Sequence, residues 1–441
     1  KKIMAYLSTW SKAMLAQVLL ASSVAAFMIP APCALSSRTP GFSDLSPGRV
    51  STPLRTPTLR AATSGLQMSA TSVALKNDLM VRVARGEKAE RTPVWLFRQA
   101  GRHLPEYQAY KKETGCNFLQ LLEDPKHVAE CTMQPVRRYN LDAAILFSDI
   151  LVVAQALNIE VTMPGGVGIQ VPNPLASPAE VATRVPKNID VQDKLSHVIA
   201  SVKLIKTELD GKVPLIGFSA APWTLMYYMV GGSSKKNQEV GERWLNEHPE
   251  ESQVLLDILT DTVIEYTSAQ VDAGADMMQI FEAMGEFISK ESFYKFAMPC
   301  MKKIADELRR RHPNTPLLVF PRGATYSLAD LQQVGYDIVT MDTQTPRAAT
   351  REALSTAAKV STPPNMMKQT SGVQGNFDVK FLKAGASTPE QVEAAVKDML
   401  EELGAGGLIA NLGEGLSGQE DSALVNAFVE AVHSVSDKML K

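Results

Sequence analysis

The segment Val94-Trp95-Leu96-Phe97-Arg98-Gln99-Ala100-Gly101-Arg102 joins an apolar run of strand length to a turn that carries two arginines. The apolar run predicts a buried strand, and Gly101 allows the backbone after it to approach a ligand closely. Arg98 and Arg102 place two permanent cations at one end of that strand, which suits the binding of carboxylates or phosphates. A strand followed by a solvated basic turn is the alternative interpretation of these residues alone.

Seven more short apolar runs follow, each ended by Gly, Pro or polar residues and then by a helical pattern. With Val94–Phe97 they predict eight strands, the others being Ala143–Phe147, Leu215–Phe218, Met277–Phe281, Leu317–Phe320, Ile338–Met341, Val373–Gly375 and Leu408–Asn411. Helices are predicted over Pro125–Tyr139 after an Asp124 cap, Pro249–Val271, Lys290–Arg311 and Thr388–Leu403, the last stopped by Gly404.

Eight alternating strand and helix units predict an α/β fold, a single (β/α)8 TIM-type barrel over residues 71–441. A doubly wound open sheet is the alternative. The residues directly after the predicted strands are polar or charged: Arg98, Arg102, Ser148, Asp149, Ser219, Glu282, Arg322, Asp342, Asn376, Asp378, Asn411 and Glu414. In a barrel these side chains would converge on the carboxyl-terminal mouth, where such folds carry out their chemistry.

The first seventy residues differ in composition from the rest. Basic residues precede an apolar stretch from Ala13 to Phe27, so residues 1–29 are interpreted as a signal-like leader. The stretch is too short and Ser-rich to favour a membrane-spanning helix, and no stable membrane insertion is expected after its removal. Residues 30–70 are rich in Ser, Thr, Pro and Arg, with Asp44 as their one acid, which is typical of a disordered transit peptide.

Such two-part leaders resemble those of algal proteins whose plastids lie inside extra membranes, and location in the plastid (chloroplast) stroma is therefore expected. A disordered tail behind a chance apolar patch is the alternative. Of the 45 basic and 47 acidic residues of the chain, seven basic and one acidic lie in the leader, so the remainder carries 38 and 46, a net charge of −8. A net negative charge argues against nucleic-acid binding as the function of this part of the chain. To bind an anion, it would need a local basic cluster such as Arg98 and Arg102.

Two further features have ordinary structural interpretations. Cys116, Cys131 and Cys300 are scattered, which disfavours a disulfide framework or a zinc site. The run Pro164–Gly168 lacks the Lys-Ser/Thr ending of a phosphate-binding loop and predicts a hairpin or turn. Asp149 could be a helix cap, but beside two arginines a lone acid also suits a ligand that has anionic arms and N–H donors.

Four motifs together resemble the uroporphyrinogen decarboxylase family, in order over about residues 71–441. They are Arg98 to Glu106 (RQAGRHLPE), Leu141 to Leu151 (LDAAILFSDIL), Ala221 to Met226 (APWTLM) and Val373 to Asn376 (VQGN). The resemblance implies a cofactor-free, metal-free (β/α)8 enzyme, usually a homodimer. Such an enzyme removes CO2 from the four acetate arms of uroporphyrinogen, through partly decarboxylated intermediates, to give coproporphyrinogen in haem and chlorophyll biosynthesis.

The resemblance also implies the roles of particular residues. Asp149 and Arg98 would be catalytic, with Asp149 accepting hydrogen bonds from the pyrrole N–H groups and staying ionised because those donors hold its pKa down. Arg98 would be the proton donor, although a pKa above about 12 makes arginine a weak acid. The implied substrate-binding residues are Arg98, Gln99, Ala100, Gly101, Arg102, Lys111, Asp149, Tyr228, Ala283 and Glu414.

Three positions depart from the family pattern. His103 stands where the family has Tyr, Ala283 where it has Ser, and Glu414 where it has His. The last change replaces a group that can be cationic with an acid facing the substrate carboxylates. Three hypotheses follow: an active plastid decarboxylase, a divergent paralogue that binds a porphyrinogen with impaired or altered turnover, and a corrinoid or thiol methyltransferase of the same superfamily, which would need a His/Cys zinc set absent from the sequence.

Overall fold

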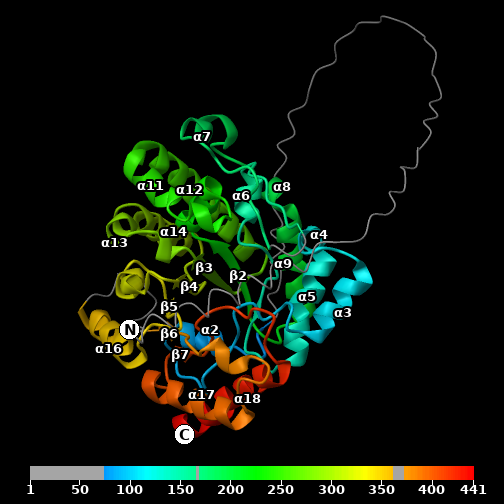
Figure 1. Cartoon of the computed structure of the whole chain (residues 1–441). Helices are drawn as coiled ribbons and strands as arrows, with labels where there is room; N and C mark the ends of the chain where they lie inside the picture. Colours follow the sequence, from blue (N-terminus) through cyan, green and yellow to red (C-terminus); the bar gives the residue numbers. More distant parts are fainter. Residues whose placement is uncertain (1–73, 165–167, 361–371) are drawn as a thin grey trace, which may run out of the picture. The chain divides into compact units, whose positions relative to one another are not determined.

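Seven parallel strands, hydrogen-bonded to one another in chain order, form the central sheet (Figure 1). The computed structural model describes residues 74–164, 168–360 and 372–441, so both predicted leader segments lie outside the described residues. The strands are β1 (Ala144–Ile145), β2 (Leu215–Ala220), β3 (Met277–Glu282), β4 (Leu317–Pro321), β5 (Ile338–Thr340), β6 (Gly372–Gln374) and β7 (Leu408–Ile409).

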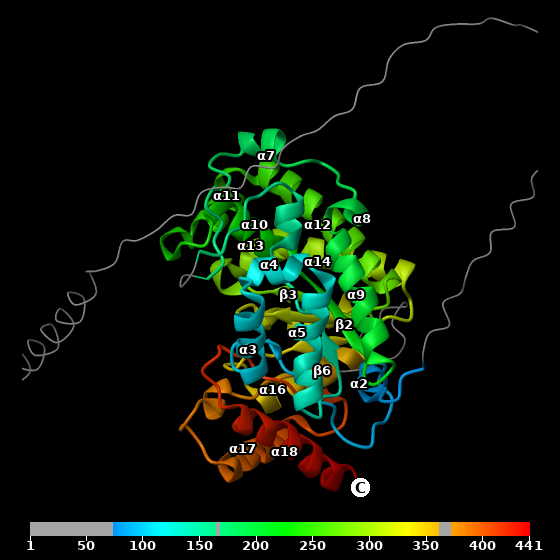
Figure 2. The same ribbon diagram turned by 90° about the vertical axis from the view of Figure 1, so that its right-hand side faces the viewer.

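Helices connect consecutive strands and, apart from α2, which precedes the first strand, lie mainly around the outside of the sheet (Figures 1 and 2). Those up to β2 are α2 (Leu79–Ala84), α3 (Pro105–Thr114), α4 (Phe118–Glu123), α5 (Pro125–Arg138), α6 (Val152–Ala156), α7 (Ala179–Arg184), α8 (Val191–Lys194) and α9 (Ser196–Leu209). Those between β2 and β4 are α10 (Pro222–Gly231), α11 (Val240–Glu247), α12 (Pro249–Asp272), α13 (Lys290–Ser292) and α14 (Met298–Arg311). The last are α15 (Leu328–Gln333), α16 (Arg347–Val360), α17 (Pro389–Leu403) and α18 (Ser422–Leu440), and short 3-10 turns lie at Lys235–Asn237, Gly285–Phe287, Thr325–Ser327 and Val379–Leu382.

The predicted first strand is wrong as a full strand, because only Val94 pairs, in one parallel bridge with Ala410 next to β7. After Val94, side chains accept the hydrogen bonds that a neighbouring strand would otherwise accept. Gln99 Oε1 accepts from the Leu96 amide at 3.3 Å, and Asn411 Oδ1 accepts from the Phe97 amide at 3.0 Å. On its other side, the Val94 carbonyl accepts from the Asp142 amide at 2.9 Å, two residues before β1.

The two faces of the sheet pack against different parts of the protein, as the period-2 alternation of strands requires. One face contributes Ile216, Met277, Leu318, Ile338 and Ile409 to a buried cluster with Trp95, Phe97 and the apolar residues of α2. Residues from five strands and the Trp95 segment meet in this one cluster, which requires the sheet to curl around it. The seven-stranded sheet is therefore curled, with its inner face packed against α2.

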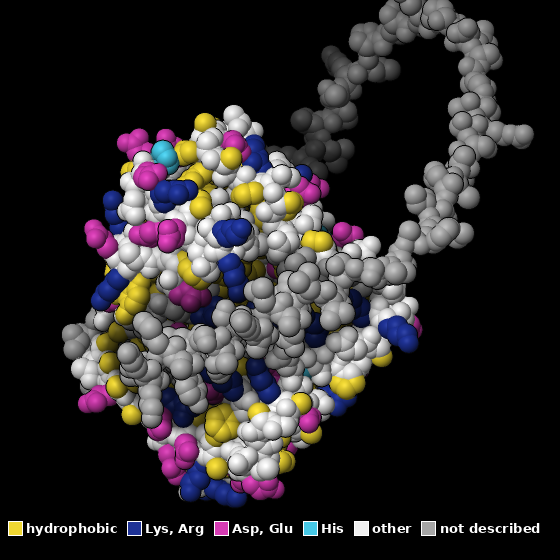
Figure 3. All heavy atoms as spheres, viewed as in Figure 1, with side chains coloured by type: hydrophobic (Ala, Val, Ile, Leu, Met, Phe, Trp, Pro, Cys, Tyr) yellow, Lys and Arg dark blue, Asp and Glu magenta, His cyan; other side chains and the backbone are white. Residues whose placement is uncertain are grey.

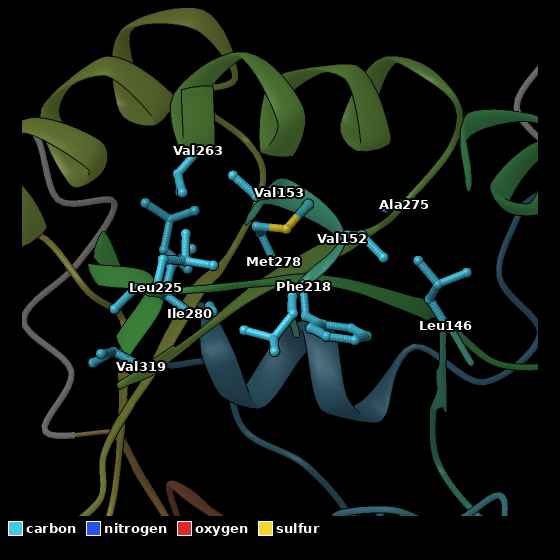
Figure 4. Packing of buried hydrophobic residues seen from close by; sticks show 14 of the residues in the cluster. Leu146, Val152, Val153, Phe218, Leu225, Val263, Ala275, Met278, Ile280 and Val319 are labelled. Carbon is cyan, nitrogen blue, oxygen red and sulfur yellow. The ribbon is translucent and has the colours of Figure 1, made fainter. Parts of the chain in front are cut away.

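The outer face packs against the helices. Met278 and Ile280 of β3 and Leu225 of α10 are fully buried in the larger apolar cluster with Val263 of α12, and Figure 4 shows part of this packing. Burying one such side chain stabilises the fold by about 1.5–3 kcal/mol. The strand and helix alternation that the sequence predicts is thus confirmed for the seven strands that follow Val94–Phe97.

The predicted helices are also present, with one interruption. Asp124 caps α5 by accepting from the Lys126 amide, and Thr388 caps α17 in a reciprocal pair with Gln391. The predicted helix Lys290–Arg311 instead contains a π-helical turn, Phe293–Ala297, immediately before α14. Pro299 has no amide hydrogen to donate to a carbonyl in the preceding turn, so the helix widens there.

The residues that flank the glycine-rich run pair with each other. Thr162 and Gln170 form an antiparallel bridge, with backbone hydrogen bonds of 2.8 and 2.7 Å in the two directions. Residues 165–167, on which the predicted turn falls, lie outside the described residues. The flanking pair therefore supports a turn and gives no support to a phosphate-binding loop that leads into a helix.

Candidate active site

Four phenylalanines, Phe97, Phe218, Phe281 and Phe320, meet at the carboxyl ends of neighbouring strand segments. Phe97 stacks on Phe320 with ring centroids 5.0 Å apart and planes 2° apart. Phe281 lies edge-on to Phe97 at 5.7 Å and to Phe218 at 5.6 Å. Phe281 is partly exposed while the other three are buried, so together they form an apolar surface, the phenylalanine floor.

The sequence analysis missed the phenylalanine floor, although a signal was present. Five of the predicted strands end in Phe, and four of them, Val94–Phe97, Leu215–Phe218, Met277–Phe281 and Leu317–Phe320, supply the floor. Taken one by one, each is an ordinary core residue at the end of a strand. Their meeting depends on the curl of the sheet, which no single strand reveals.

A chain of buried side-chain hydrogen bonds joins the Trp95 segment to β5 and β6. Trp95 Nε1 donates to Gln374 Oε1 at 2.7 Å, and Gln374 Nε2 donates to Thr340 Oγ1 at 2.8 Å. All three side chains are fully buried. Buried polar groups that are fully satisfied fix one arrangement of the elements that carry them, here the Trp95 segment, β5 and β6.

The loop Arg98–Arg102 leaves the inner cluster through a sharp turn. Arg98 has φ 58°, a left-handed conformation that residues other than glycine adopt at a cost, and Gly101 has φ 148°. Gln99 is fully buried, and its side chain bonds the backbone at Leu96 and at the Ala143 carbonyl, 3.3 Å away. Of the predicted substrate-binding residues, Gln99 therefore holds the loop, whereas Ala100 and Gly101 remain partly exposed.

Two glycines after β7 leave the space that the side chains of Arg98 and Arg102 occupy. A Cβ atom on Gly415 would lie 2.7 Å from Arg98 Cδ, and one on Gly418 would lie 2.7 Å from Arg102 Cβ. A larger residue at either position would displace an arginine. The sequence analysis did not identify these glycines, because their contacts join segments more than 300 residues apart.

The loop that contains these glycines is pinned by Glu420. The buried carboxylate of Glu420 accepts from the amides of Ser417, Gly418 and Gln419 at 2.8 to 3.1 Å, and from Ser417 Oγ at 2.8 Å. Four donors on one carboxylate fix the backbone against which Arg102 packs. These hydrogen bonds outweigh the effect of burial and lower the pKa of Glu420.

Arg98 and Arg102 both present exposed side chains, and neither forms an ion pair or a guanidinium hydrogen bond within residues 74–164, 168–360 and 372–441. Protein atoms surround Arg98 on its other sides. This desolvation and then the nearby charge of Arg322 lower its pKa below the ordinary value for arginine. The space-filling view shows Lys and Arg side chains gathered in the central part of this face (Figure 3). Since neither arginine is paired with a carboxylate among the described residues, both are available to bind an anionic ligand.

Asp149 is 4% exposed and has one carboxylate oxygen, Oδ2, without a hydrogen-bond partner in the part of the chain that the structure describes. Burial raises its pKa to about 6, although the amides of Leu151 and Ile150 favour the charged form. In the free protein the two backbone donors do not offset burial, and the expected lowering of the pKa by pyrrole N–H donors stays a prediction for the complex. A buried acceptor without a donor is suited to a ligand that brings N–H groups.

Tyr228 of α10 links Asp149 to the arginines. Burial raises the pKa of Tyr228 to about 12, and the charges that act on its hydroxyl include those of Asp149, Arg98 and Arg322. These four side chains, which come from different segments, are therefore brought together. Glu414 is half-buried and its charge acts on Arg98, so it belongs to the same group.

Two other predicted residues are placed less directly. Ala283 is partly exposed after β3, and its amide donates to Thr224 Oγ1 at 2.8 Å. Lys111 is exposed on α3, and its side chain forms no ion pair or hydrogen bond among the described residues. No contact joins Lys111 to Arg98 or Arg102 in the described part of the chain.

Several side chains that were expected at the mouth hold the structure instead. Glu282 points to α10, where its Oε1 accepts from Thr224 Oγ1 and from the Met284 amide, and burial raises its pKa to about 7. Asn376 donates to the carbonyls of Asp342 and Thr345. Successive side chains of a strand point to opposite faces of the sheet. Because Phe281 lies on the inner face, the neighbouring Glu282 of β3 points outward to α10.

His103 also has a structural environment. It is buried, it stacks on Tyr139 with ring centroids 6.2 Å apart, and burial lowers its pKa to about 4. The imidazole is therefore neutral at physiological pH. The change at this position leaves the charge of the site as it was.

No group of three or more His, Cys, Asp or Glu side chains is placed to hold a metal ion in residues 74–164, 168–360 and 372–441. Within the same ranges, every helix is too short or too polar to cross a bilayer.

The family whose sequence model matches this chain is described as "Uroporphyrinogen decarboxylase (URO-D)", and the match covers residues 75–435. A uroporphyrinogen decarboxylase of Salinibacter ruber is 41% identical over 365 residues, which cover 83% of this chain and 98% of the relative. One of Danio rerio is 40% identical over 373 residues, which cover 83% and 96%. Among solved structures, a methyltransferase from Methanosarcina mazei has a TM-score of 0.65 at 19% identity over 81% of this chain and 98% of that one, a likeness of fold alone.

Proposed function

Since this chain belongs to the uroporphyrinogen decarboxylase family, we propose that it is a carboxy-lyase that removes CO2 from the four acetate arms of uroporphyrinogen in tetrapyrrole biosynthesis. The product is coproporphyrinogen, and partly decarboxylated porphyrinogens are the intermediates. Within the structure, one observation carries the proposal. It is the buried Asp149 Oδ2, which has no donor among the described residues and is grouped with Tyr228 and Arg98.

The shape and charge of the site support this substrate class. A porphyrinogen is a ring of apolar pyrroles with N–H groups at its centre and carboxylates around its edge. The phenylalanine floor offers an apolar surface to the ring, while Arg98 and Arg102 offer cations to its edge. Each carboxylate held by a charge-assisted hydrogen bond contributes about 1.5–3 kcal/mol.

Asp149 is the proposed centre of the chemistry. Pyrrole N–H groups that donate to the carboxylate favour its charged form, so binding is expected to lower its pKa from about 6. Protonation of a ring carbon then makes the pyrrole an electron sink. The bond to the departing carboxylate breaks, its electron pair neutralises the ring cation, and CO2 leaves. A proton added to the resulting methylene and one lost from the ring carbon complete the methyl group.

The ionised Asp149 would stabilise the ring cation, an electrostatic role worth about 3–4 kcal/mol. The pyrrole supplies its own electron sink, and we therefore expect the reaction to need no metal or organic cofactor. Arg98, whose pKa is lowered by desolvation and by Arg322, is the proposed source of the proton. Glu414 and Ala283 would face the arms of the substrate.

The finer architecture and the setting of the enzyme are also proposals. The bridge between Val94 and Ala410, with the hydrogen bond from Asp142 to Val94, supports closure of the curled sheet into a (β/α)8 barrel. A homodimer is proposed from the family resemblance. Location in the plastid stroma, with supply of both haem and chlorophyll, is proposed from the composition of residues 1–70.

Glu414 and Ala283 favour one second candidate, a divergent paralogue that binds a porphyrinogen with impaired or altered turnover. An anaerobic time course separates the two. The purified chain is incubated with uroporphyrinogen, and the products are oxidised and resolved by number of carboxylates. Steady formation of coproporphyrinogen supports the decarboxylase, whereas tight binding without CO2 release, or a halt at intermediates, supports the paralogue.

A further inference from the structure

The stack between Phe97 and Phe320 brings two arginines to one place. Arg98 follows Phe97 directly, and Arg322 comes two residues after Phe320. Because the two rings lie face to face with centroids 5.0 Å apart, the strand ends that carry these arginines meet across the phenylalanine floor. The charge of Arg322 accordingly acts on Arg98.

The backbone of Arg322 is anchored while its side chain is left open. Its amide donates to the Glu282 carbonyl at 2.9 Å, which continues the pairing of β4 with β3. The side chain is 42% exposed, and the one ion pair that it forms with the described residues, to Glu286, spans 3.7 Å between Nη1 and Oε1, too long for a hydrogen bond. An exposed pair of this length contributes little, so most of the capacity of the guanidinium to bind an anion is unused.

The charge of Arg322 acts on the residues of the proposed site. It disfavours protonated Arg98 more strongly than the charge of Arg102 does, and it also acts on the Tyr228 hydroxyl. The two positive charges repel each other, and in the described part of the chain no aspartate or glutamate forms a hydrogen bond with either guanidinium. Such an arrangement is unfavourable in the free protein and becomes favourable once an anion lies between them.

We propose that Arg322 is a third carboxylate-binding residue of this site, which holds one arm of the porphyrinogen together with Arg98 and the hydroxyl of Tyr228. The inference deepens the proposed function and rests on it for the identity of the ligand. The arm is an acetate or a propionate, which share the carboxylate that the guanidinium recognises. Arg322 binds this arm without taking part in the breaking of a bond.

Substitution of Arg322 tests the proposal. Arg322→Gln removes the charge and keeps the length, Arg322→Lys keeps the charge without the planar pair of donors, and Glu286→Gln removes the weak partner. Arg137→Gln, an exposed arginine of α5 paired with Glu130, is the matched control. Each is measured for KM and kcat with uroporphyrinogen, for equilibrium binding of coproporphyrinogen, and for Tm.

Arg322→Gln is expected to raise KM about tenfold, consistent with one charge-assisted hydrogen bond. Since the charge of Arg322 also lowers the pKa of Arg98, a fall in kcat smaller than the rise in KM is expected with it. Arg322→Lys should lie between it and wild type, and Glu286→Gln and Arg137→Gln should keep the wild-type KM. If the arm is a propionate, the binding of coproporphyrinogen weakens as well. If it is an acetate, coproporphyrinogen binding is unchanged while uroporphyrinogen binding falls.

Equal KM and equal binding of both porphyrinogens in wild type and Arg322→Gln would overturn the role of Arg322. A fall in Tm that accompanies a loss of kcat with unchanged KM would also overturn it, because the residue would then be structural. Failure of the proposed function would look different. Wild type itself would release no CO2, and the binding measurements would still decide whether Arg322 holds a carboxylate.

Discussion

Asp142 and Asp149 lie at opposite ends of β1, and their pKa values are shifted in opposite directions although both carboxylates are buried. Asp142 accepts from Arg91 twice at 2.7 Å, from His433 Nε2 at 2.9 Å, and from Asn77 and the Val94 amide. Although burial would raise its pKa, the hydrogen bonds from His433 and Arg91 lower it to about 2. Asp149 keeps an unpartnered oxygen, and burial raises its pKa to about 6. One carboxylate is therefore satisfied by the fold, and the other is left for a ligand.

We predict that Asp149→Asn abolishes most decarboxylation and leaves the fold intact. The neutral amide cannot stabilise a protonated pyrrole, a loss of about 3–4 kcal/mol in the transition state. The measurement is kcat with uroporphyrinogen, with circular dichroism as the check on folding. A near-normal kcat in this variant would remove Asp149 from the mechanism.

The raised pKa of Asp149 predicts how stability and activity depend on pH. Its pKa is raised from 3.8 to about 6, so the folded state holds the proton more tightly, and the stability this contributes below about pH 4 is lost as pH rises through 6. Above pH 6 the ionised group costs up to about 3 kcal/mol. Asp149→Asn should therefore raise Tm at pH 7.5 and give no gain below pH 4. For wild type, kcat/KM should rise with pH through about 6, and a flat profile would contradict the assignment.

Asp142→Asn offers the matched contrast. Removal of this charge leaves Arg91 without its partner and breaks several buried hydrogen bonds that join α18, β1 and the segment before Phe97. We expect a loss of about 3–5 kcal/mol in the free energy of unfolding, measured by urea denaturation. Activity per folded molecule should stay close to wild type, since Asp142 lies at the end of β1 remote from Asp149. A stable variant with low activity would place it in the site instead.

Arg98→Ala and Arg102→Ala should each weaken substrate binding more than stability. Each guanidinium is exposed and has no protein partner among the described residues, so its loss removes carboxylate hydrogen bonds worth about 1.5–3 kcal/mol without breaking the core. KM for uroporphyrinogen is the measurement, and Arg137→Ala serves as a control for the loss of a surface cation. Unfolding of both variants with unchanged KM would show that they support the loop.

Gly418→Val tests independently whether the packing of Arg102 against Gly418 is needed for substrate binding. A Cβ atom there would lie 2.7 Å from Arg102 Cβ, and Gly418 has φ 96°, so a branched residue both strains the loop and displaces the arginine. We expect a rise in KM as large as that of Arg102→Ala, with kcat less affected. Wild-type KM in Gly418→Val would mean that Arg102 can be displaced without loss of binding.

The sequence predicted what depends on local pattern. Apolar runs and caps such as Asp124 and Thr388 identify seven strands and the main helices, because each signal lies within one element. It could not predict that the side chains of Asn411 and Gln99 accept backbone hydrogen bonds in place of a neighbouring strand. Nor could it predict that Gly415 and Gly418 leave space for the arginine side chains, since these contacts join distant segments. It also missed the burial that raises the pKa of Asp149, which depends on every neighbour at once.

The final prediction concerns Glu414, where the chain departs from its family. Glu414 is half-buried, its charge acts on Arg98, and it has no ion pair or hydrogen bond among the described residues. An ionised glutamate near a carboxylate arm costs roughly 1 kcal/mol at intermediate dielectric, or about fivefold in kcat/KM. Glu414→His is therefore expected to raise kcat/KM for uroporphyrinogen by about that factor, and Ala283→Ser, which adds a hydroxyl beside the arms, should add to the gain.

Glu414→Gln separates the two parts of this effect, because it removes the negative charge without supplying a cation. It should give part of the gain of Glu414→His, through lower KM, while Tm stays near the wild-type value. A fall in kcat/KM for Glu414→His would mean that the surroundings of Arg98 have been rebuilt around the acid. In that case Glu414 serves a porphyrinogen with altered turnover, and the divergent paralogue becomes the better account of this chain.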